Sequence, residues 1–103
     1  MARQQTLTTY PNKNVAAAAT PEVLYASSKL VCSLVVQALS TNTDFIYVGT
    51  SARQLFALAP GKSLELHGDS LDNGAQAYLD INTIYIRVAV NGEGVAFMTC
   101  DGY

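Results

Sequence analysis

The sequence predicts an all-β protein, a small antiparallel β-sandwich or barrel of the immunoglobulin-like or jelly-roll-like kind. Three observations lead to this prediction. Apolar and polar residues alternate with a period of two in several segments. These segments are short and are separated by Gly, Pro, Asn and Asp, which are typical of turns. No window keeps a helical period of 3.6 over three turns. A chain of 103 residues that is 50% hydrophobic fits one domain with one modest core.

The N-terminal segment differs from the rest of the chain. Residues 1–14 are polar, rich in Thr, Gln and Asn, and contain no periodic apolar set. We therefore expect residues 1–14 to form an extended N-terminal arm and residues 15–103 to form a single β-sandwich domain. Residues 16–20 or residues 22–25 could add a strand at a sheet edge, where Pro21 limits the pairing.

The alternating segments predict five strands. In residues 30–39 both faces are largely apolar, which is typical of a strand covered on both sides. Residues 44–49 follow after a polar connection, residues 40–43, whose length suits a hairpin or a short arch. The remaining strands are expected at residues 63–67, 83–90 and 95–100.

Two connections carry strong turn signals. In Ala59-Pro60-Gly61-Lys62 the proline fixes φ and the glycine permits the positive φ of a type II turn. Asn91-Gly92-Glu93-Gly94 predicts a hairpin turn, because Asn-Gly is favoured where two residues need positive φ. Residues 68–82 are polar, and we expect a loop there with a short helical turn around residues 75–78.

Charge and hydropathy exclude several classes of function. Charged residues make up only 14% of the chain, and the net charge is −2, so no basic surface for nucleic acid is expected. No apolar run is long enough for a membrane helix. The first residues lack the apolar centre of a signal peptide, and we expect synthesis in the cytoplasm.

Few residues suit catalysis. His67 is the only histidine and ends an alternating segment, so we expect a half-exposed strand residue. Its nearest carboxylates are Glu65, on the same strand face, and Asp69. No Gly-x-Ser-x-Gly turn is present. The sequence therefore predicts no catalytic residues and a protein that is not an enzyme.

Metal, phosphate and ring-stacking sites are also not expected. Asp69, Asp72, Asn73 and Asp80 could offer oxygen ligands, but their spacing does not match a calcium loop and favours a solvated turn. No glycine-rich loop precedes a helix, so no phosphate or other cofactor site is predicted. The aromatic residues that alternate within strands indicate packing in a core or an interface: Phe45, Tyr47, Tyr85 and Phe97.

The two cysteines, Cys32 and Cys100, follow no CxxC spacing and have no neighbouring histidines, which argues against zinc. Three interpretations remain: small buried apolar side chains, a disulfide between the first long strand and the last, or a reactive thiol. The sequence favours the first.

Five segments, in order, resemble small virion proteins of tailed bacteriophages. That group has a strand ending in an Asn-Thr loop, a VYVG strand, a LAPG(E/K)S turn, an acidic L-D-x-x-x-I-Y segment and a G-x-G-V hairpin. The matching segments here lie within residues 35–43, 46–49, 58–64, 79–85 and 92–95. The chain departs from the pattern in residues 68–78, which are longer than expected, and in residues 99–103, which continue past the last strand.

The resemblance implies a non-enzymatic structural protein on the capsid surface, made in the host cytoplasm. Decoration proteins of this kind are usually trimers. We therefore expect a cement protein that stabilises the phage head by binding the major capsid protein, forms homotrimers through apolar strand faces, and lays residues 1–14 along the shell by strand addition. Alternatives are an adaptor at the base of a head or tail fibre or spike, and a host-surface glycan-binding module that uses residues 68–78. A small enzyme that depends on His67 is a further alternative.

Overall fold

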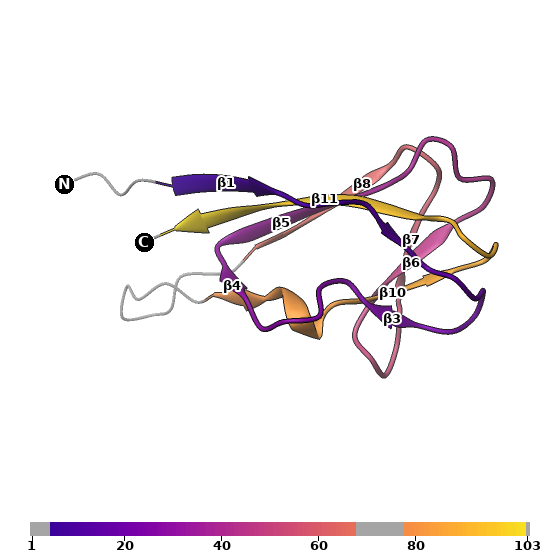
Figure 1. The fold of residues 1–103 in the computed structure, drawn as a ribbon, viewed down its shortest axis with the longest axis horizontal. Coiled ribbons are helices and arrows are strands. Elements are labelled where there is room, and N and C mark those ends of the chain that lie inside the picture. The colour runs from indigo at the N-terminus through magenta and orange to yellow at the C-terminus, as the bar shows by residue number, and fades with distance from the viewer. Residues whose placement is uncertain (1–4, 68–77, 103) are drawn as a thin grey trace.

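The computed structural model describes residues 5–67 and 78–102 and confirms the predicted all-β class (Figure 1). Two antiparallel sheets pack face to face in an elongated molecule of 47 × 25 × 22 Å. Sheet A runs in the order β1-β11-β5-β8, and β2 also pairs with β11. Its strands are β1 (Gln5–Thr9), β2 (Lys13–Asn14), β5 (Ser33–Ala38), β8 (Ser63–His67) and β11 (Gly94–Gly102).

The second layer contains sheet B, with the order β3-β10-β6-β7, and a two-stranded pair. The strands of sheet B are β3 (Glu22–Val23), β6 (Ile46–Gly49), β7 (Phe56–Leu58) and β10 (Tyr85–Val88). The pair consists of β4 (Leu30–Val31) and β9 (Leu79–Asp80), and the 3-10 turn η1 (Ile81–Thr83) follows β9. The expected edge strand in residues 22–25 is confirmed as β3.

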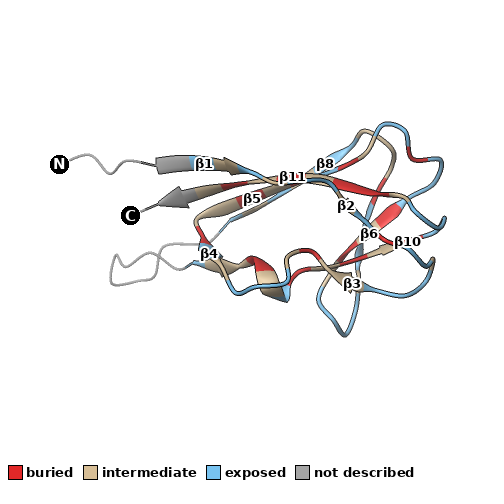
Figure 2. Cartoon of the chain, viewed as in Figure 1, coloured by how far each residue is buried: buried red, intermediate tan, exposed pale blue. Residues whose placement is uncertain are grey.

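The core lies between the two layers, where buried residues of both sheets face each other (Figure 2). Along β5, for example, Leu34, Val36 and Ala38 are buried, Val35 is half-buried and Gln37 is exposed. The prediction that residues 30–39 are covered on both faces is therefore wrong. The apolar residues on the outer face of this segment led to the wrong prediction. Only one face of β5 packs against another layer.

A β-bulge divides the expected first strand into β4 and β5. The Cys32 N–H donates to the Cys100 carbonyl at 2.9 Å, while Ser33 is the register partner of the same Cys100. Cys32 and Ser33 thus lie opposite the single residue Cys100. This bulge bends the strand and shifts the alternation of inward and outward side chains. As a result Val31 and Leu34 are both buried although they are three residues apart, and β4 leaves sheet A to pair with β9.

The connections between the sheets are mostly arches. Residues 39–45 lead from β5 in sheet A to β6 in sheet B, which confirms the arch among the two predicted alternatives. Residues 89–93 lead from β10 in sheet B to β11 in sheet A, so the predicted hairpin at residues 91–94 is wrong. The turn itself is present, and Gly92 has the positive φ that the sequence predicted, +84°. The strands separate because Val88 and Val95, which flank the turn, are both buried in the core between the sheets.

The described part of the expected N-terminal arm is extended but belongs to sheet A. β1 is in antiparallel register with Met98 to Gly102, and β2 is in register with Gly94 and Val95. The reason is that β11 would otherwise leave one row of backbone hydrogen-bonding groups unpaired. The polar composition of this segment did not indicate a strand. The segment contributes to the sheet mainly through its backbone hydrogen bonds.

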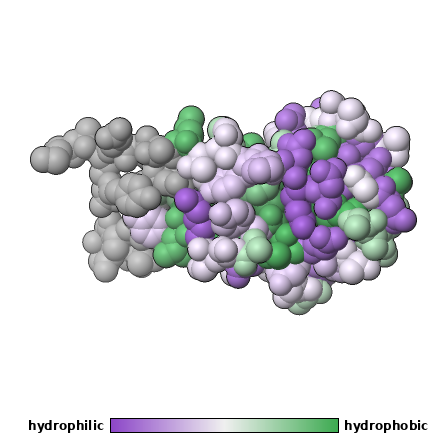
Figure 3. Space-filling view, viewed as in Figure 1, coloured by the Kyte–Doolittle hydropathy of each residue, from purple (hydrophilic) through white to green (hydrophobic). Residues whose placement is uncertain are grey.

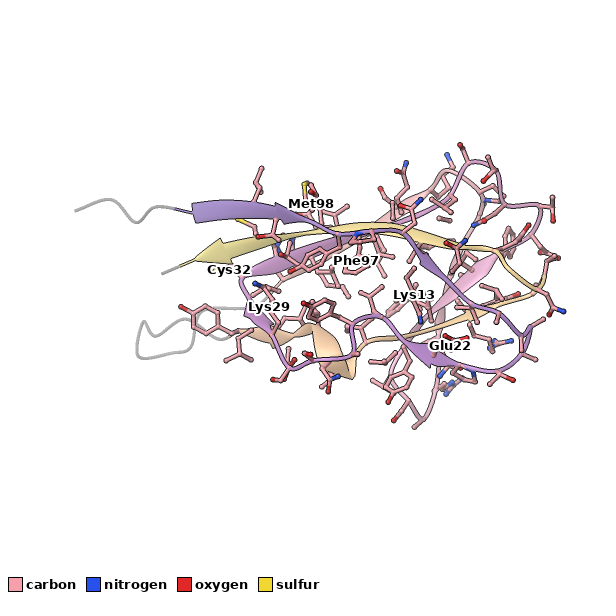
Figure 4. All side chains as sticks on the ribbon, in the orientation of Figure 1. Lys13, Glu22, Lys29, Cys32, Phe97 and Met98 are labelled. Carbon is pink, nitrogen blue, oxygen red and sulfur yellow. The ribbon has the colours of Figure 1, made fainter. Side chains whose placement is uncertain are left out.

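Tyr10 packs against β11 and Tyr25, and Lys13 links this segment to the second layer. The Tyr10 ring stacks on Phe97 with centroids 4.7 Å apart, meets Tyr25 edge-on at 5.2 Å, and its hydroxyl lies 3.2 Å from Thr99 Oγ1. Lys13 Nζ reaches from sheet A to Glu22 Oε1 in sheet B at 2.8 Å (Figure 4). Figure 4 also shows Phe97 pointing between the layers and Met98 pointing away from them.

The 3-10 turn η1 is the helical turn that the structure describes in the region of residues 68–82. The helical turn expected around residues 75–78 and most of the expected loop lie outside the described residues. Figure 3 views the edge of the sandwich that β2 and β3 form, and it shows a band of hydrophilic residues with hydrophobic residues on either side.

The turn at residues 59–62 gives a test of local backbone strain. Lys62 N–H donates to the Ala59 carbonyl at 2.9 Å, and Gly61 has φ +80°, which confirms the predicted type II turn. A Cβ at this position would meet no atom within 4 Å, so a substitution acts through φ alone. We expect Gly61→Val to reduce the free energy of unfolding by about 1–3 kcal/mol and Gly61→Asn by less, since Asn tolerates positive φ. Urea unfolding measures both, and equal losses would contradict this explanation.

Candidate functional site

The outer surface of sheet B carries a group of aromatic, aliphatic and arginine side chains, which we call the aromatic–arginine face. Its members alternate along their strands with core residues, so they point away from the core. Register places Tyr85 between Val23 and Gly49, and places Tyr47 between Arg87 and Ala57. The members come from all four strands of sheet B: Val23, Tyr47, Ala57, Tyr85 and Arg87.

Arg87 is the one arginine among the members of this face and lies on β10, an inner strand of sheet B. Its Cζ atom is 4.2 Å from the centroid of the Tyr47 ring, a cation–π contact that also uses the planar shape of the guanidinium. Within residues 5–67 and 78–102, no carboxylate forms an ion pair with Arg87. The guanidinium is therefore held in position by a ring, while its N–H donors have no anionic partner in the described chain.

Exposed apolar residues flank the aromatic–arginine face. Gly49 permits the chain after β6 to fold back closely, because a Cβ there would lie 2.7 Å from Gln54 Cα. This returning segment presents Leu55 with 57% of its surface exposed. Phe56 follows with 52% exposed, on the opposite face of β7 from Ala57, because its register partner Val48 is a core residue. Phe45, next to the first residue of β6, is also exposed. Exposed apolar side chains on a sheet that also presents an arginine and two tyrosines are typical of protein-binding surfaces.

The alternation in the sequence predicted packing in a core or an interface for four aromatic residues: Phe45, Tyr47, Tyr85 and Phe97. The structure separates them. Phe97 is buried in the core, Tyr47 and Tyr85 are half-buried on the aromatic–arginine face, and Phe45 is exposed. The shared position of Tyr47 and Tyr85 on one face could not be predicted from periodicity, because it depends on the register between β6 and β10.

Two of the motif segments contact each other around the start of β11. The Asn42 side chain donates to the Gly94 carbonyl at 2.8 Å and accepts from the Gly94 N–H at 3.3 Å. The Glu93 carboxylate accepts from the Thr43 N–H at 2.6 Å and from its hydroxyl at 2.8 Å. These hydrogen bonds join the arch at residues 39–45 to the end of the arch at residues 89–93 and the start of β11. The motif residues of the Asn-Thr loop and the G-x-G-V segment therefore have a structural role.

The outer surface of sheet A is different in character. One row across it contains Leu7, Cys100, Ser33 and His67, and the next contains Thr9, Met98, Val35 and Glu65. Leu7 has 65% of its surface exposed. In the described part of this surface, His67 Nε2 lies 3.0 Å from Glu65 Oε1.

His67 is an exposed residue at the end of β8, as predicted. Ser33 is its register partner, yet no side-chain hydrogen bond joins these two residues in the described structure. The second carboxylate considered for His67, Asp69, lies outside the described residues. The described residues thus place His67 beside a surface carboxylate and show no side-chain contact between His67 and a serine.

The described residues contain no group of three His, Cys, Asp or Glu side chains that could hold a metal ion. Asp69, Asp72 and Asn73 of the expected solvated turn lie outside the described residues. Asp80 is engaged in hydrogen bonds to its own chain: it accepts from the Ser28 hydroxyl at 2.6 Å and from the N–H groups of Lys29 and Asn82, each at 3.0 Å. Asp80 thereby caps η1 and fixes the segment before β4.

Cys32 and Cys100 are not joined in a disulfide, and both are half-buried rather than fully buried. They lie next to each other at the β-bulge, since the Cys32 N–H donates to the Cys100 carbonyl. The structure therefore has neither the disulfide nor the fully buried pair among the three interpretations. In the described part of the chain, no helix has the length and apolar character needed to cross a membrane.

Comparisons with known proteins add no relative. No family model matches the chain, and no curated protein or solved structure matches it. The resemblance to bacteriophage virion proteins therefore rests on the sequence motifs alone.

The carboxylate of Asp80 gives a prediction about pH. Hydrogen bonds, that from Ser28 first and those from Asn82 and Lys29 next, hold the pKa of Asp80 below its ordinary value. Because the folded pKa is below that of the unfolded chain, about 3.9, ionised Asp80 stabilises the fold above that pH. This stabilisation is lost as the pH falls through the folded pKa. Glu22 acts in the same direction, because the hydrogen bond from Lys13 lowers its pKa.

We expect Ser28→Ala to raise the pKa of Asp80 and to make the loss of stability between pH 5 and pH 3 smaller than in the wild type. Carboxyl-carbon NMR titration measures the pKa, and urea unfolding at several pH values measures the stability. Ser63→Ala, an exposed serine on β8, is the matched control. An unchanged Asp80 titration in Ser28→Ala would contradict the assignment.

Proposed function

We propose that this protein is a non-enzymatic structural protein of a bacteriophage virion, a capsid decoration or cement protein that binds the major capsid protein and stabilises the head. One observation carries the proposal. The motifs that carry the resemblance include Tyr47 and Tyr85, and these two tyrosines occupy the same outer face although neither is needed in the core. Many other motif residues, such as Ile46 and Val48, lie in the core, and others have roles in turns and arches. A binding role for this face explains why Tyr47 and Tyr85 are present although the core does not require them.

The composition of the aromatic–arginine face supports docking on a protein shell. Tyrosine and arginine are enriched at the centres of protein interfaces, since they combine large apolar area with hydrogen-bonding groups. The face is built on a four-stranded sheet, so its side chains are held by a rigid support before binding. A preformed surface loses little conformational entropy on association, which favours affinity.

The proposed homotrimer requires a second surface, and the outer face of sheet A offers one. Leu7, Met98 and Val35 provide apolar area on adjacent strands, and Leu7 is largely exposed. The sandwich places this surface opposite the aromatic–arginine face. Sister copies and the capsid could thus be bound at the same time.

The N-terminal segment has a different part in this proposal from that expected of a free arm. Residues 5–9 and 13–14 are paired with β11, and Tyr10 packs on Phe97. Deletion of residues 1–14 would uncover β11, so its effects on binding and on folding could not be separated. Substitutions on the two outer faces are the better test.

The capsid prediction is tested with shells of the parent phage that lack this protein. We expect the purified chain to bind in a copy number on the order of hundreds per particle, as repeated symmetric positions require, and to raise the temperature at which the shells open. Gel densitometry of sedimented particles gives the copy number. A copy number in the tens would favour the fibre-base or spike-base adaptor instead. Absence of binding to shells, together with hits on a glycan array that Tyr78→Ala abolishes, would favour the glycan-binding module.

The trimer prediction is tested by light scattering on the purified chain. We expect Leu7→Ser to shift the trimer towards monomer by at least about tenfold in dissociation constant, because burying a leucine contributes about 1.5–3 kcal/mol. Phe56→Ser, which removes a comparably exposed apolar side chain from the edge of sheet B, is the control and should leave the trimer intact. A wild-type chain that is monomeric at high concentration would rule out the trimer.

A further inference from the structure

The arginine of the aromatic–arginine face suggests what this face recognises. Arg87 is stacked on Tyr47, and no described carboxylate pairs with it. We infer that Arg87 binds a carboxylate on an acidic segment of a protein partner, while Tyr47 and Tyr85 receive apolar parts of the same segment. The inference deepens the proposed function, on which it depends only for the identity of the partner.

The stacked geometry prepares Arg87 for such a ligand. A guanidinium whose flat surface rests on a ring keeps N–H donors at its edge available, and these match the two oxygens of a carboxylate. The contact with Tyr47 also restricts the long side chain before binding, which lowers the entropy lost when the ion pair forms. A lysine at this position would provide charge without the planar pair of donors.

The charges around the face favour an anionic ligand. Three described carboxylates lie near sheet B in the chain, and each has a partner of its own. Glu22 is bound to Lys13, and Glu93 accepts hydrogen bonds from Thr43 and from the Asp44 N–H. Asp44 accepts from the Phe45 N–H at 2.7 Å. No described carboxylate therefore competes with an incoming one.

The apolar members of the face favour a protein segment over a sugar. Val23 and Ala57 lie on the outer strands of sheet B, on either side of the tyrosines, and offer no hydrogen-bonding side chains. The polar groups of the five members are the two phenol hydroxyls and one guanidinium. An acidic sugar would leave many hydroxyl groups without partners on such a surface, whereas an acidic residue flanked by apolar residues would match it.

The first experiment measures binding of three variants to the phage shells described above. We expect Arg87→Gln to weaken binding at least about tenfold, and Arg87→Lys to weaken it by a smaller factor, since lysine keeps the charge and loses the bidentate geometry. Arg53→Gln removes an exposed arginine that is not a member of the face, and it should change binding less than about twofold. Thermal unfolding of each variant confirms that the fold is retained.

The second experiment does not depend on the shells. The capped peptides acetyl-Phe-Glu-Phe-amide and acetyl-Phe-Gln-Phe-amide are titrated into the labelled full chain, and NMR follows the Arg87 Nε–Hε resonance. We expect the glutamate peptide to shift this resonance and the glutamine peptide to shift it much less. Sialyllactose is titrated as the acidic-sugar probe and should have no effect.

The outcomes separate the two proposals. If the wild type does not bind shells but the glutamate peptide still shifts Arg87, the proposed capsid function is wrong and carboxylate recognition stands. If the wild type binds shells and Arg87→Gln binds equally well, the function stands and the role of Arg87 is wrong. Equal shifts from both peptides, or a shift from sialyllactose alone, would also overturn the inference.

Discussion

The pairing of β11 on both of its sides is the constraint on which the rest of the structure depends. β11 hydrogen-bonds to β5 along one edge and to β1 and β2 along the other. Its inward residues Val95, Phe97 and Thr99 lie across the centre of the core. Both arches are fixed at its beginning through Asn42 and Glu93, and Tyr10 reaches the core by stacking on Phe97. A change in the register of β11 would therefore move residues in every part of the sandwich.

Much of this architecture could be predicted from the sequence, for identifiable reasons. The segments that became β6, β8, β10 and β11 keep strict alternation because one face packs on the core and the other meets solvent. The turn at Gly61 follows from a proline and a glycine whose backbone preferences are local. These features depend on near neighbours in the chain, and such neighbours are visible in a single sequence.

The features that could not be predicted depend on distant partners. β1 and β2 are polar and contribute backbone hydrogen bonds, which composition does not reveal. The turn at residues 91–94 has hairpin chemistry, yet the burial of Val88 and Val95 between opposite sheets separates its two strands. The bulge at Cys32 shifted the alternation of residues 30–39, so both faces appeared apolar. The candidate site was missed in the same way, because Tyr47, Tyr85 and Arg87 meet only through the register of β6 with β10.

The order of the strands also bears on how the protein reaches this structure during synthesis. β1 and β2 leave the ribosome before any other described strand, but their only partner, β11, is the last described strand to be made. Until then β5 also lacks one neighbour. Sheet A must therefore close through contacts between the two ends of the described chain, a topology that slows folding and exposes unpaired strand edges to other chains. A nascent chain stalled before β11 would be a partly formed sandwich in which β5 presents an unpaired edge and β1 and β2 have no partner.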